Sequence, residues 1–184
     1  MLASPWHADA LRTLRDVGGK AVWIGAGFVR NAVWDDLHGR MPGRPVDIDV
    51  LIHEPGAGSE REGELEKSLH AAAPDKPWSV RNQARMHAKH GDDPYPDLAA
   101  AMRRWPETAT AVAVRMDGDD GLWIVAPFGL SDLVRGILRP AEDSDRCRRA
   151  FDGRLTQKGW LSHWPGLAVE GPWPAAMGET KDNG

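Results

Sequence analysis

Two aspartates separated by one residue, Asp47 and Asp49, carry the clearest chemical signal in the sequence. They lie in the segment VDIDVLI, whose alternation of polar and apolar residues predicts a β-strand. Alternate residues of a strand face the same side, so the two carboxylates are expected to project together. Neighbouring carboxylates repel each other unless a counter-charge accompanies them. Mg²⁺, or Mn²⁺ in its place, is the expected partner, because Mg²⁺ is typically held by one or two carboxylates plus substrate phosphates.

A turn containing two glycines, Gly25-Ala26-Gly27, precedes the aspartates in the chain. It follows KAVWIG, a predicted buried strand, and leads into FVRNAVWDDLHG, whose apolar spacing predicts a helix that ends at Gly39. A turn between a strand and a helix often cradles phosphate, since the free N–H groups at the start of a helix attract anions. Arg30 falls in the first turn of that helix and is placed to contact a phosphate or a sugar.

Two other glycine-rich phosphate loops and one structural alternative compete with this interpretation. In the dinucleotide-binding fingerprint, one acid after the glycines holds a ribose. Here the third glycine is absent, Arg30 stands where close helix–strand packing needs a small residue, and the acid is doubled. A Walker loop is excluded, because no Gly-Lys-Ser/Thr follows the turn. The structural alternative is an exposed strand with two solvated aspartates. It would be preferred for the Asp-x-Asp motif alone, but the glycine turn upstream favours the metal site.

The composition predicts one soluble globular domain. The chain has 184 residues, of which 41% are hydrophobic and 27% charged. A net charge of −4 with acids and bases mixed throughout argues against a surface for duplex DNA. The apolar runs are too short for a membrane span, and charged residues interrupt the N-terminal segment where a signal peptide needs an apolar core. A single cysteine, Cys147, excludes an internal disulfide and indicates a cytoplasmic location.

The segment WIGAGFVRNAVWDDLHG followed by VDIDVLI resembles the opening signature of the DNA polymerase β-type nucleotidyltransferase superfamily. It is especially similar to the head domain of bacterial poly(A) polymerases and CCA-adding tRNA nucleotidyltransferases. Their pattern is Gly-Gly-x-Val-Arg-Asp and then Asp-x-Asp. A smaller bacterial family of nucleotidyltransferase-like proteins, once a domain of unknown function, is similar across most of the chain. The segments that carry this second resemblance are WSVRNQARMH, WPETATAVAVR, APFGLSDLVRGILRP and KGWL.

The resemblance implies the fold and its boundaries. We expect a single α/β (α+β) domain of the nucleotidyltransferase, polymerase β-like palm type, with a short mixed sheet and helices packed on one face. The domain is expected to cover residues 1–165, and residues 166–184 to form a Pro- and Gly-rich, poorly ordered tail. The glycine turn and the aspartate strand are expected at one end of the sheet.

The resemblance also implies roles for individual residues. Asp47 and Asp49 would be the catalytic pair and hold the metal. The nucleotide would be bound by Gly25, Ala26, Gly27, Arg30 and Asn31. Two of these depart from the family pattern, since Ala26 replaces the first glycine of the pair and Asn31 replaces the aspartate after the arginine.

A third carboxylate, which many superfamily members carry on a later strand, has no clear equivalent. The corresponding segment WSVRNQARMH offers only Arg81, Asn82 and Gln83, and the nearby acids Glu107 and Asp93 have no spacing argument behind them. On this predicted strand Arg81, Arg85 and His87 would alternate on one face and either line an acceptor site or form a solvated basic face. The RCRR run, together with Arg139 and Arg154, either contacts an acidic acceptor or forms a solvated helix face, and the second interpretation is favoured.

The expected function is the magnesium-dependent transfer of a nucleoside monophosphate from an NTP substrate to the hydroxyl of an unidentified acceptor, which is a small molecule, a protein or RNA. Because no third carboxylate is evident, the first alternative is a degenerate nucleotidyltransferase fold that binds a nucleotide or a protein partner without turnover. The second alternative, a Rossmann-like dinucleotide-binding protein, is disfavoured by Arg30.

Overall fold

The computed structural model describes residues 4–119 and 121–172. Its α-helices are α1 (Pro5–Gly18), α2 (Gly27–Leu37), α3 (Ser59–Ala72), α4 (Met86–His90), α5 (Leu98–Met102), α6 (Ser131–Val134), α7 (Asp145–Lys158) and α8 (Trp160–His163). Two 3-10 turns are η1 (Gly19–Ala21) and η2 (Gln83–Arg85). The strands are β1 (Trp23–Gly25), β2 (Ile48–Ile52), β3 (Trp78–Asn82), β4 (Ala113–Met116), β5 (Leu122–Val125), β6 (Ile137–Leu138) and β7 (Ala168–Val169).

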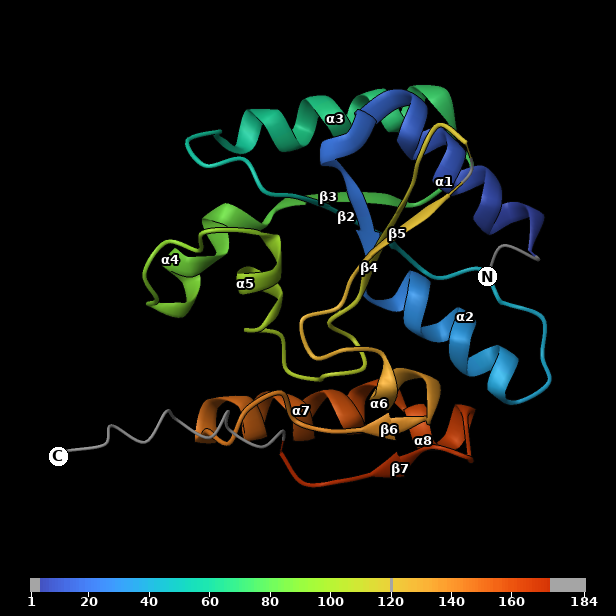
Figure 1. Ribbon diagram of the computed structural model, residues 1–184, viewed down its shortest axis with the longest axis vertical. Coiled ribbons are helices and arrows are strands. Elements are labelled where there is room, and N and C mark those ends of the chain that lie inside the picture. The colour runs from blue at the N-terminus through green and yellow to red at the C-terminus, as the bar shows by residue number, and fades with distance from the viewer. Residues whose placement is uncertain (1–3, 120, 173–184) are drawn as a thin grey trace, which may run out of the picture.

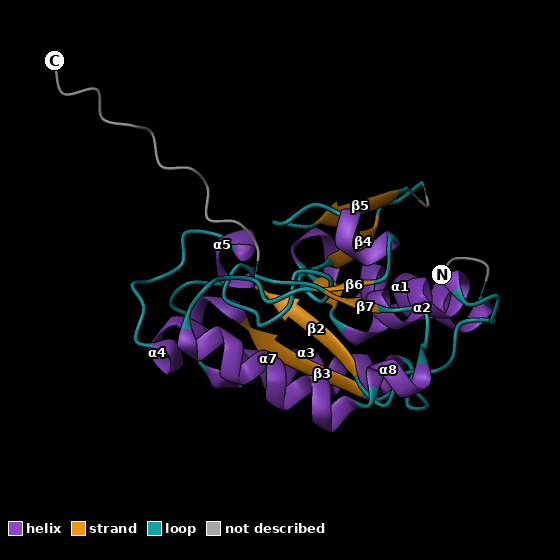
Figure 2. Cartoon of the chain, turned by 90° about the horizontal axis from the view of Figure 1, so that it is seen from below, coloured by secondary structure: helices purple, strands orange, loops and turns teal. Residues whose placement is uncertain are grey.

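A mixed five-stranded sheet in the order β3-β2-β1-β4-β5 forms the centre of the molecule (Figure 1). β2 and β3 are parallel and run side by side in Figure 2, whereas β1 pairs antiparallel with both β2 and β4. The chain passes from β2 to β3 through α3, because parallel strands need a crossover connection, which is usually a helix. The α/β fold with a mixed sheet, expected from the sequence, is confirmed.

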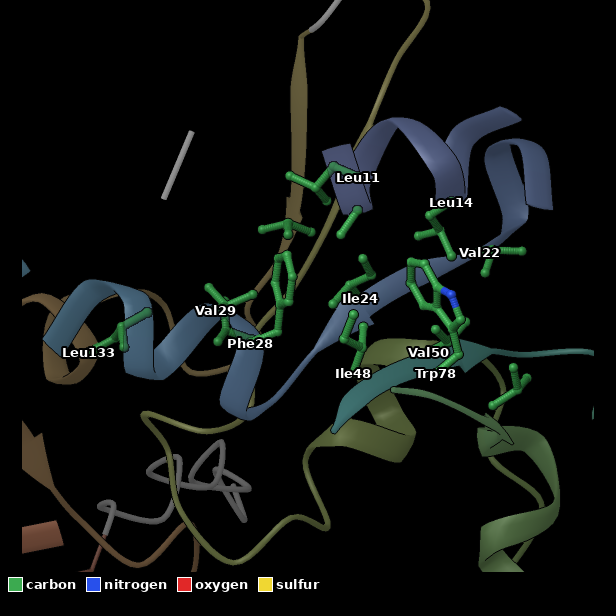
Figure 3. Packing of buried hydrophobic residues seen from close by; sticks show 14 of the residues in the cluster. Leu11, Leu14, Val22, Ile24, Phe28, Val29, Ile48, Val50, Trp78 and Leu133 are labelled. Carbon is green, nitrogen blue, oxygen red and sulfur yellow. The ribbon is translucent and has the colours of Figure 1, made fainter. Parts of the chain in front are cut away.

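The main core lies between one face of this sheet and the helices α1 and α3 (Figure 1). Figure 3 shows Leu11 and Leu14 of α1 packed toward Ile24 of β1 and Val50 of β2. The apolar spacing of α1 is what places these leucines on one side of the helix. On the opposite face of the sheet, a smaller cluster joins α5 to residues such as Leu51.

The third strand is shorter than the sequence predicts. β3 ends at Asn82, whose side chain accepts a hydrogen bond from the Ala84 N–H and donates one to the Glu54 carbonyl. These bonds offer the backbone an alternative to the strand, and the chain continues as η2 and α4. The prediction that Arg85 and His87 alternate on a strand with Arg81 is therefore wrong.

The C-terminal part of the described chain packs below the sheet as α6, α7, α8 and the parallel pair β6–β7 (Figure 1). The helix α6 ends after one turn, because Gly136 adopts a φ of 66° and the chain enters β6. Leu167 is buried and β7 follows it, so the folded domain extends past the expected boundary at residue 165. The rest of the expected tail, residues 173–184, lies outside the described residues. Of the described helices, none combines the length and apolarity that crossing a membrane requires.

Candidate active site

The two aspartates lie at the start of β2. Asp49 is half-buried within the strand, and Asp47 is exposed directly before it. Burial raises the pKa of the Asp49 carboxyl above its ordinary value, and the charge of Asp47 raises it further. The arginines Arg154, Arg30 and Arg81 act in the opposite direction. The two carboxylates thus interact unfavourably in the absence of a cation, which is the relationship that their spacing suggested.

Ala26 holds the turn between β1 and α2 in a conformation that side chains rarely adopt. Its φ of 52° makes it the one non-glycine residue with positive φ in the described ranges 4–119 and 121–172. Its N–H donates to the carbonyl of Val112, and its own carbonyl accepts from the N–H of Arg30. Strained backbone of this kind tends to occur at binding sites, where the surrounding structure holds it in place.

Replacing Ala26 with Gly is expected to raise the stability of the protein by about 1 kcal/mol, because strain of about 1–3 kcal/mol disappears while the unfolded chain gains some freedom. For a chain of this length, that is about 2–4 °C in melting temperature. The control Ala71→Gly, at an exposed position of α3, should instead lose up to about 1 kcal/mol. Thermal unfolding measures both. A loss of stability in Ala26→Gly would show that the turn is not strained.

The two glycines of the turn have different surroundings. A Cβ on Gly25 would lie 2.8 Å from Leu51 Cδ1 and 3.1 Å from the Val112 carbonyl oxygen, so Gly25 is needed for packing within the sheet. Two cavities adjoin this turn, one of about 700 Å³ and one of about 490 Å³. Gly25 lies in β1 and lines neither of them, which argues against the direct nucleotide contact expected for it. A Cβ on Gly27 would meet only Asn31 at 3.7 Å and Arg30 at 3.8 Å, both ordinary contacts. The fold therefore tolerates a Cβ at Gly27, because both contacts are of ordinary van der Waals length.

Arg30 is almost fully buried, with 5% of its surface exposed. Its Nη1 donates to Thr110 Oγ1 at 2.7 Å and its Nη2 donates to Asn31 Oδ1 at 2.9 Å. The guanidinium also lies over the rings of Trp34 and Trp160, 5.1 and 4.6 Å from their centroids. Burial lowers the pKa of Arg30 to about 10, which leaves the group charged at neutral pH. The side chain is thus a fixed positive charge beside the turn.

Arg154 of α7 forms an ion pair with Glu107, which is 0% exposed. Arg154 Nε donates to Glu107 Oε1 at 2.6 Å, and its guanidinium lies over the ring of Trp160 at 5.5 Å. The interpretation of this arginine as part of a solvated helix face is therefore wrong. Local sequence carried no sign of the pair, because the partners are 47 residues apart in the chain.

Replacing Arg154 with Met is expected to destabilise the protein by about 3 kcal/mol, because it leaves a buried carboxylate without its ion partner. The double variant with Glu107→Gln should recover most of that loss, since the uncompensated charge is gone. Arg149→Met, an exposed change in the same helix, is the matched control. Urea unfolding measures all three. Equal stabilities of Arg154→Met and Arg149→Met would mean that the pair contributes nothing.

A cleft of about 700 Å³ opens where the turn, the aspartates and the helices α7 and α8 meet. It is lined by residues of the turn and the start of α2, by both aspartates, and by basic and aromatic residues of the C-terminal helices. These are Ala26, Gly27, Arg30, Asn31, Asp47, Asp49, Arg154, Lys158 and Trp160, with six further residues from residue 45 to 164. A second cavity of about 490 Å³ shares Ala26, Asp49 and Arg154 with the cleft.

The donor set of the cleft suits Mg²⁺ bound together with a phosphate ligand. Within the described part of the chain, no group of three or more His, Cys, Asp or Glu residues could hold a metal ion. Glu107 is paired with Arg154, and Asp93 lines a different cavity, so neither supplies a third ligand here. Two carboxylate groups with substrate phosphates are nevertheless a common way in which proteins hold this ion.

A family model described as nucleotidyltransferase matches residues 12–169 of the chain. Among solved structures, one described as revealing a CCA-adding enzyme head domain by NMR is 31% identical, with a TM-score of 0.78. The match covers 92% of this chain and 91% of that one. No curated protein matches the chain.

Longer proteins share the fold at lower identity. A CCA-adding enzyme in complex with CTP is 16% identical with a TM-score of 0.60, and the match covers 91% of this chain and 41% of that one. The Bacillus stearothermophilus CCA-adding enzyme in complex with CTP is 19% identical with a TM-score of 0.50, again over 91% of this chain and 41% of that one. This chain therefore spans less than half the length of these two enzymes.

Proposed function

The chain belongs to the nucleotidyltransferase family, and from that premise we propose that it transfers a nucleoside monophosphate from an NTP to an acceptor hydroxyl. One observation carries this proposal. The glycine turn, the carboxylate pair and the basic side chains of α7 all line a single cleft. A phosphate-binding turn and two metal-binding carboxylates on one wall are the parts that phosphoryl transfer needs.

The triphosphate is proposed to lie at the start of α2. The first N–H groups of a helix lack partners within it, and the helix dipole favours an anion there. Gly27 allows the phosphates to approach this backbone, because it lines the cleft and carries no side chain. Lys158 and Arg154 of α7 add positive charge to the cleft, and the buried charge of Arg30 lies beside the turn. Asn31, which holds the Arg30 guanidinium, acts through that arginine.

Asp47 and Asp49 are proposed to hold Mg²⁺ or Mn²⁺, whose charge, when bound, neutralises phosphate oxygens and acidifies the acceptor hydroxyl. The acceptor oxygen forms a bond to the α-phosphorus, and the bond from that phosphorus to the bridging oxygen of the β-phosphate breaks. Pyrophosphate leaves with the electron pair of the broken bond. The half-buried Asp49 lines the cleft and is placed to take the hydroxyl proton and pass it to solvent.

The related structures support a nucleoside triphosphate as one substrate. Two CCA-adding enzymes of the same fold are described in complex with CTP. Because this chain covers only 41% of each, the RNA acceptor of such enzymes does not follow from the likeness. A cytoplasmic location is part of the proposal and agrees with the single thiol.

The second candidate function is nucleotide binding without turnover. The observation that favours it is that the described cleft residues offer two carboxylates and no third. Both candidates predict metal-dependent binding of an NTP, and they differ in whether pyrophosphate is released.

Incubation of the protein with each α-labelled NTP, Mg²⁺ or Mn²⁺ and a panel of acceptors separates the two candidates. The panel contains proteins, tRNA and small hydroxyl compounds. Transfer predicts that label moves to one acceptor class and that an equal amount of pyrophosphate appears. Saturable NTP binding with no pyrophosphate from any acceptor would favour the non-catalytic binder.

A further inference from the structure

The second cavity adjoins the cleft at Asp49 but is built from different elements. Its wall is mainly apolar and comes from β2, η2–α4, the segment after α5, and α7. The larger apolar side chains are Leu51, Met86, Trp105, Pro106 and Cys147. Its volume of about 490 Å³ falls within the range of about 300–1,000 Å³ that is usual for small-molecule sites. Asp49 therefore lines both the cleft and the adjoining cavity.

The charges around this cavity favour an anion. Its lining contains Arg81, Arg104, Arg146 and Arg154, whereas Asp49 is the one acidic residue among the lining residues that the structure describes. Arg104 is paired with two carboxylates, and Arg146 and Arg154 each lie beside one.

Arg81 differs from the other three arginines. Its Nη1 donates to the carbonyl of Val80, and over residues 4–119 and 121–172 no carboxylate lies within ion-pair distance of it. Arg81 is exposed in β3 and lines the cavity together with Asp49 and Leu51. An anionic group of a ligand would meet an available guanidinium there.

We propose that the second cavity is the acceptor pocket and that the acceptor is a small amphipathic anion bearing a hydroxyl group. This inference rests on the proposed transfer reaction. The apolar body of the acceptor lies against Leu51, Trp105 and Cys147, and its anionic group binds Arg81. Its hydroxyl faces Asp49, so that the oxygen attacks the α-phosphorus of an NTP in the cleft and pyrophosphate leaves on the far side. The hydroxyl proton passes to solvent.

A small acceptor fits the cavity better than an RNA end. Binding a strand requires a track of cations along several phosphates and aromatic surfaces for successive bases. Here three of the four lining arginines already lie beside protein carboxylates, and the chain carries a net charge of −4. One available arginine beside an apolar wall matches one anionic group on an apolar body.

The fluorescent probe 8-anilinonaphthalene-1-sulfonate tests the proposal, because it combines an apolar aromatic body with one sulfonate. We expect the folded protein to bind it with enhanced fluorescence. Ala150→Trp, an exposed change on α7 at the cavity wall, should weaken binding at least about tenfold by filling the space. Arg81→Gln should weaken it by about tenfold, because it removes the charged hydrogen-bonding partner. Ala71→Trp and Arg149→Gln, exposed and outside both cavities, are the matched controls.

The same titration is repeated with saturating Mg²⁺ and ATP, CTP, GTP or UTP, and separately with tRNA. The proposal predicts that neither the NTPs nor tRNA displace the probe. Displacement by an NTP would overturn it and assign the cavity to the nucleotide, and displacement by tRNA would assign it to an RNA end. Probe binding that is absent, or that is equal in all four variants, would also overturn it.

The melting temperature of each variant with Mg²⁺ and NTP separates this inference from the function on which it rests. Ala150→Trp and Arg81→Gln should keep the nucleotide-induced rise in melting temperature. If that rise is present but the probe binds differently from the results predicted above, only the assignment of the acceptor pocket is wrong. If the wild-type protein shows no rise, the transfer function fails, and the acceptor assignment fails with it.

Discussion

Asp49→Asn is expected to remove the metal-dependent part of NTP binding and to lower nucleotidyl transfer at least about 10²-fold, since a bound metal supplies several kcal/mol of charge stabilisation. Asn keeps the shape of the side chain but is a weaker ligand for Mg²⁺ and cannot take a proton. The apo protein should be as stable as the wild type or slightly more so. Burial and Asp47 both disfavour the charged form of Asp49, and the Asn side chain removes that charge.

The pH dependence of this stability difference follows from the direction of the shift. Because the pKa of Asp49 is raised in the folded state, its favourable contribution is complete below the ordinary pKa of an aspartate. It is lost as the pH rises through the folded-state value. The stability advantage of Asp49→Asn should therefore be present at neutral pH and shrink under acidic conditions.

The control for this variant is Asp36→Asn, an exposed aspartate of α2 that lines neither cavity. It should change neither binding nor stability. If Asp49 instead supported the fold through backbone N–H groups or arginines, the Asn variant would lose about 1–3 kcal/mol and keep its response to metal. That pattern contradicts the assignment of the pair to a metal.

Gly27→Val is expected to abolish NTP binding in a protein that remains folded. The position has ordinary backbone geometry for an L-residue, and an added Cβ makes only ordinary contacts, so a side chain is accommodated. Its branched carbons would occupy the cleft next to the first N–H groups of α2, where the phosphates are proposed to lie. Gly27→Ala should weaken binding less, because its single methyl group makes only ordinary contacts with the neighbouring protein atoms.

Calorimetric titration with Mg²⁺ and each NTP measures the loss, and far-ultraviolet circular dichroism verifies the fold. Gly63→Val, at an exposed helical position of α3 with no atom near the added Cβ, is the control. NTP affinity equal to wild type in Gly27→Val would show that the turn only connects β1 to α2.

The sequence predicted the elements whose signal is local. Residue patterning is enough to identify β1, α2 and β2, and the order of strand, turn, helix and aspartate strand brings Gly27 and Asp49 to one cleft. The end of β3 was missed because it depends on the side chain of Asn82, which bonds to Glu54 from a distant loop. Residue patterns do not record such contacts.

Two features of the site, the Arg154–Glu107 ion pair and the strained turn residue Ala26, were also not predicted, because local residue patterns do not reveal them. Arg154 was assigned to solvent, since its helix looks charged all round and its buried partner Glu107 is remote in the chain. The strain at Ala26 was equally invisible, although the family pattern has glycine at that position. The φ of 52° explains why the family has glycine at this position, since glycine adopts positive φ without strain. Ala26 departs from that pattern and carries the strain.

The central claim is that this cleft binds an NTP through a divalent cation. Thermal unfolding of the wild-type protein with each of the four NTPs, with Mg²⁺ and with EDTA, tests it most directly. A ligand at about a hundred times its dissociation constant adds about 2.7 kcal/mol, which is about 5–10 °C for a chain of this size. We predict a rise of that order with at least one NTP in Mg²⁺ and none in EDTA. An unchanged melting temperature with all four NTPs, or a rise that persists in EDTA, would contradict the claim.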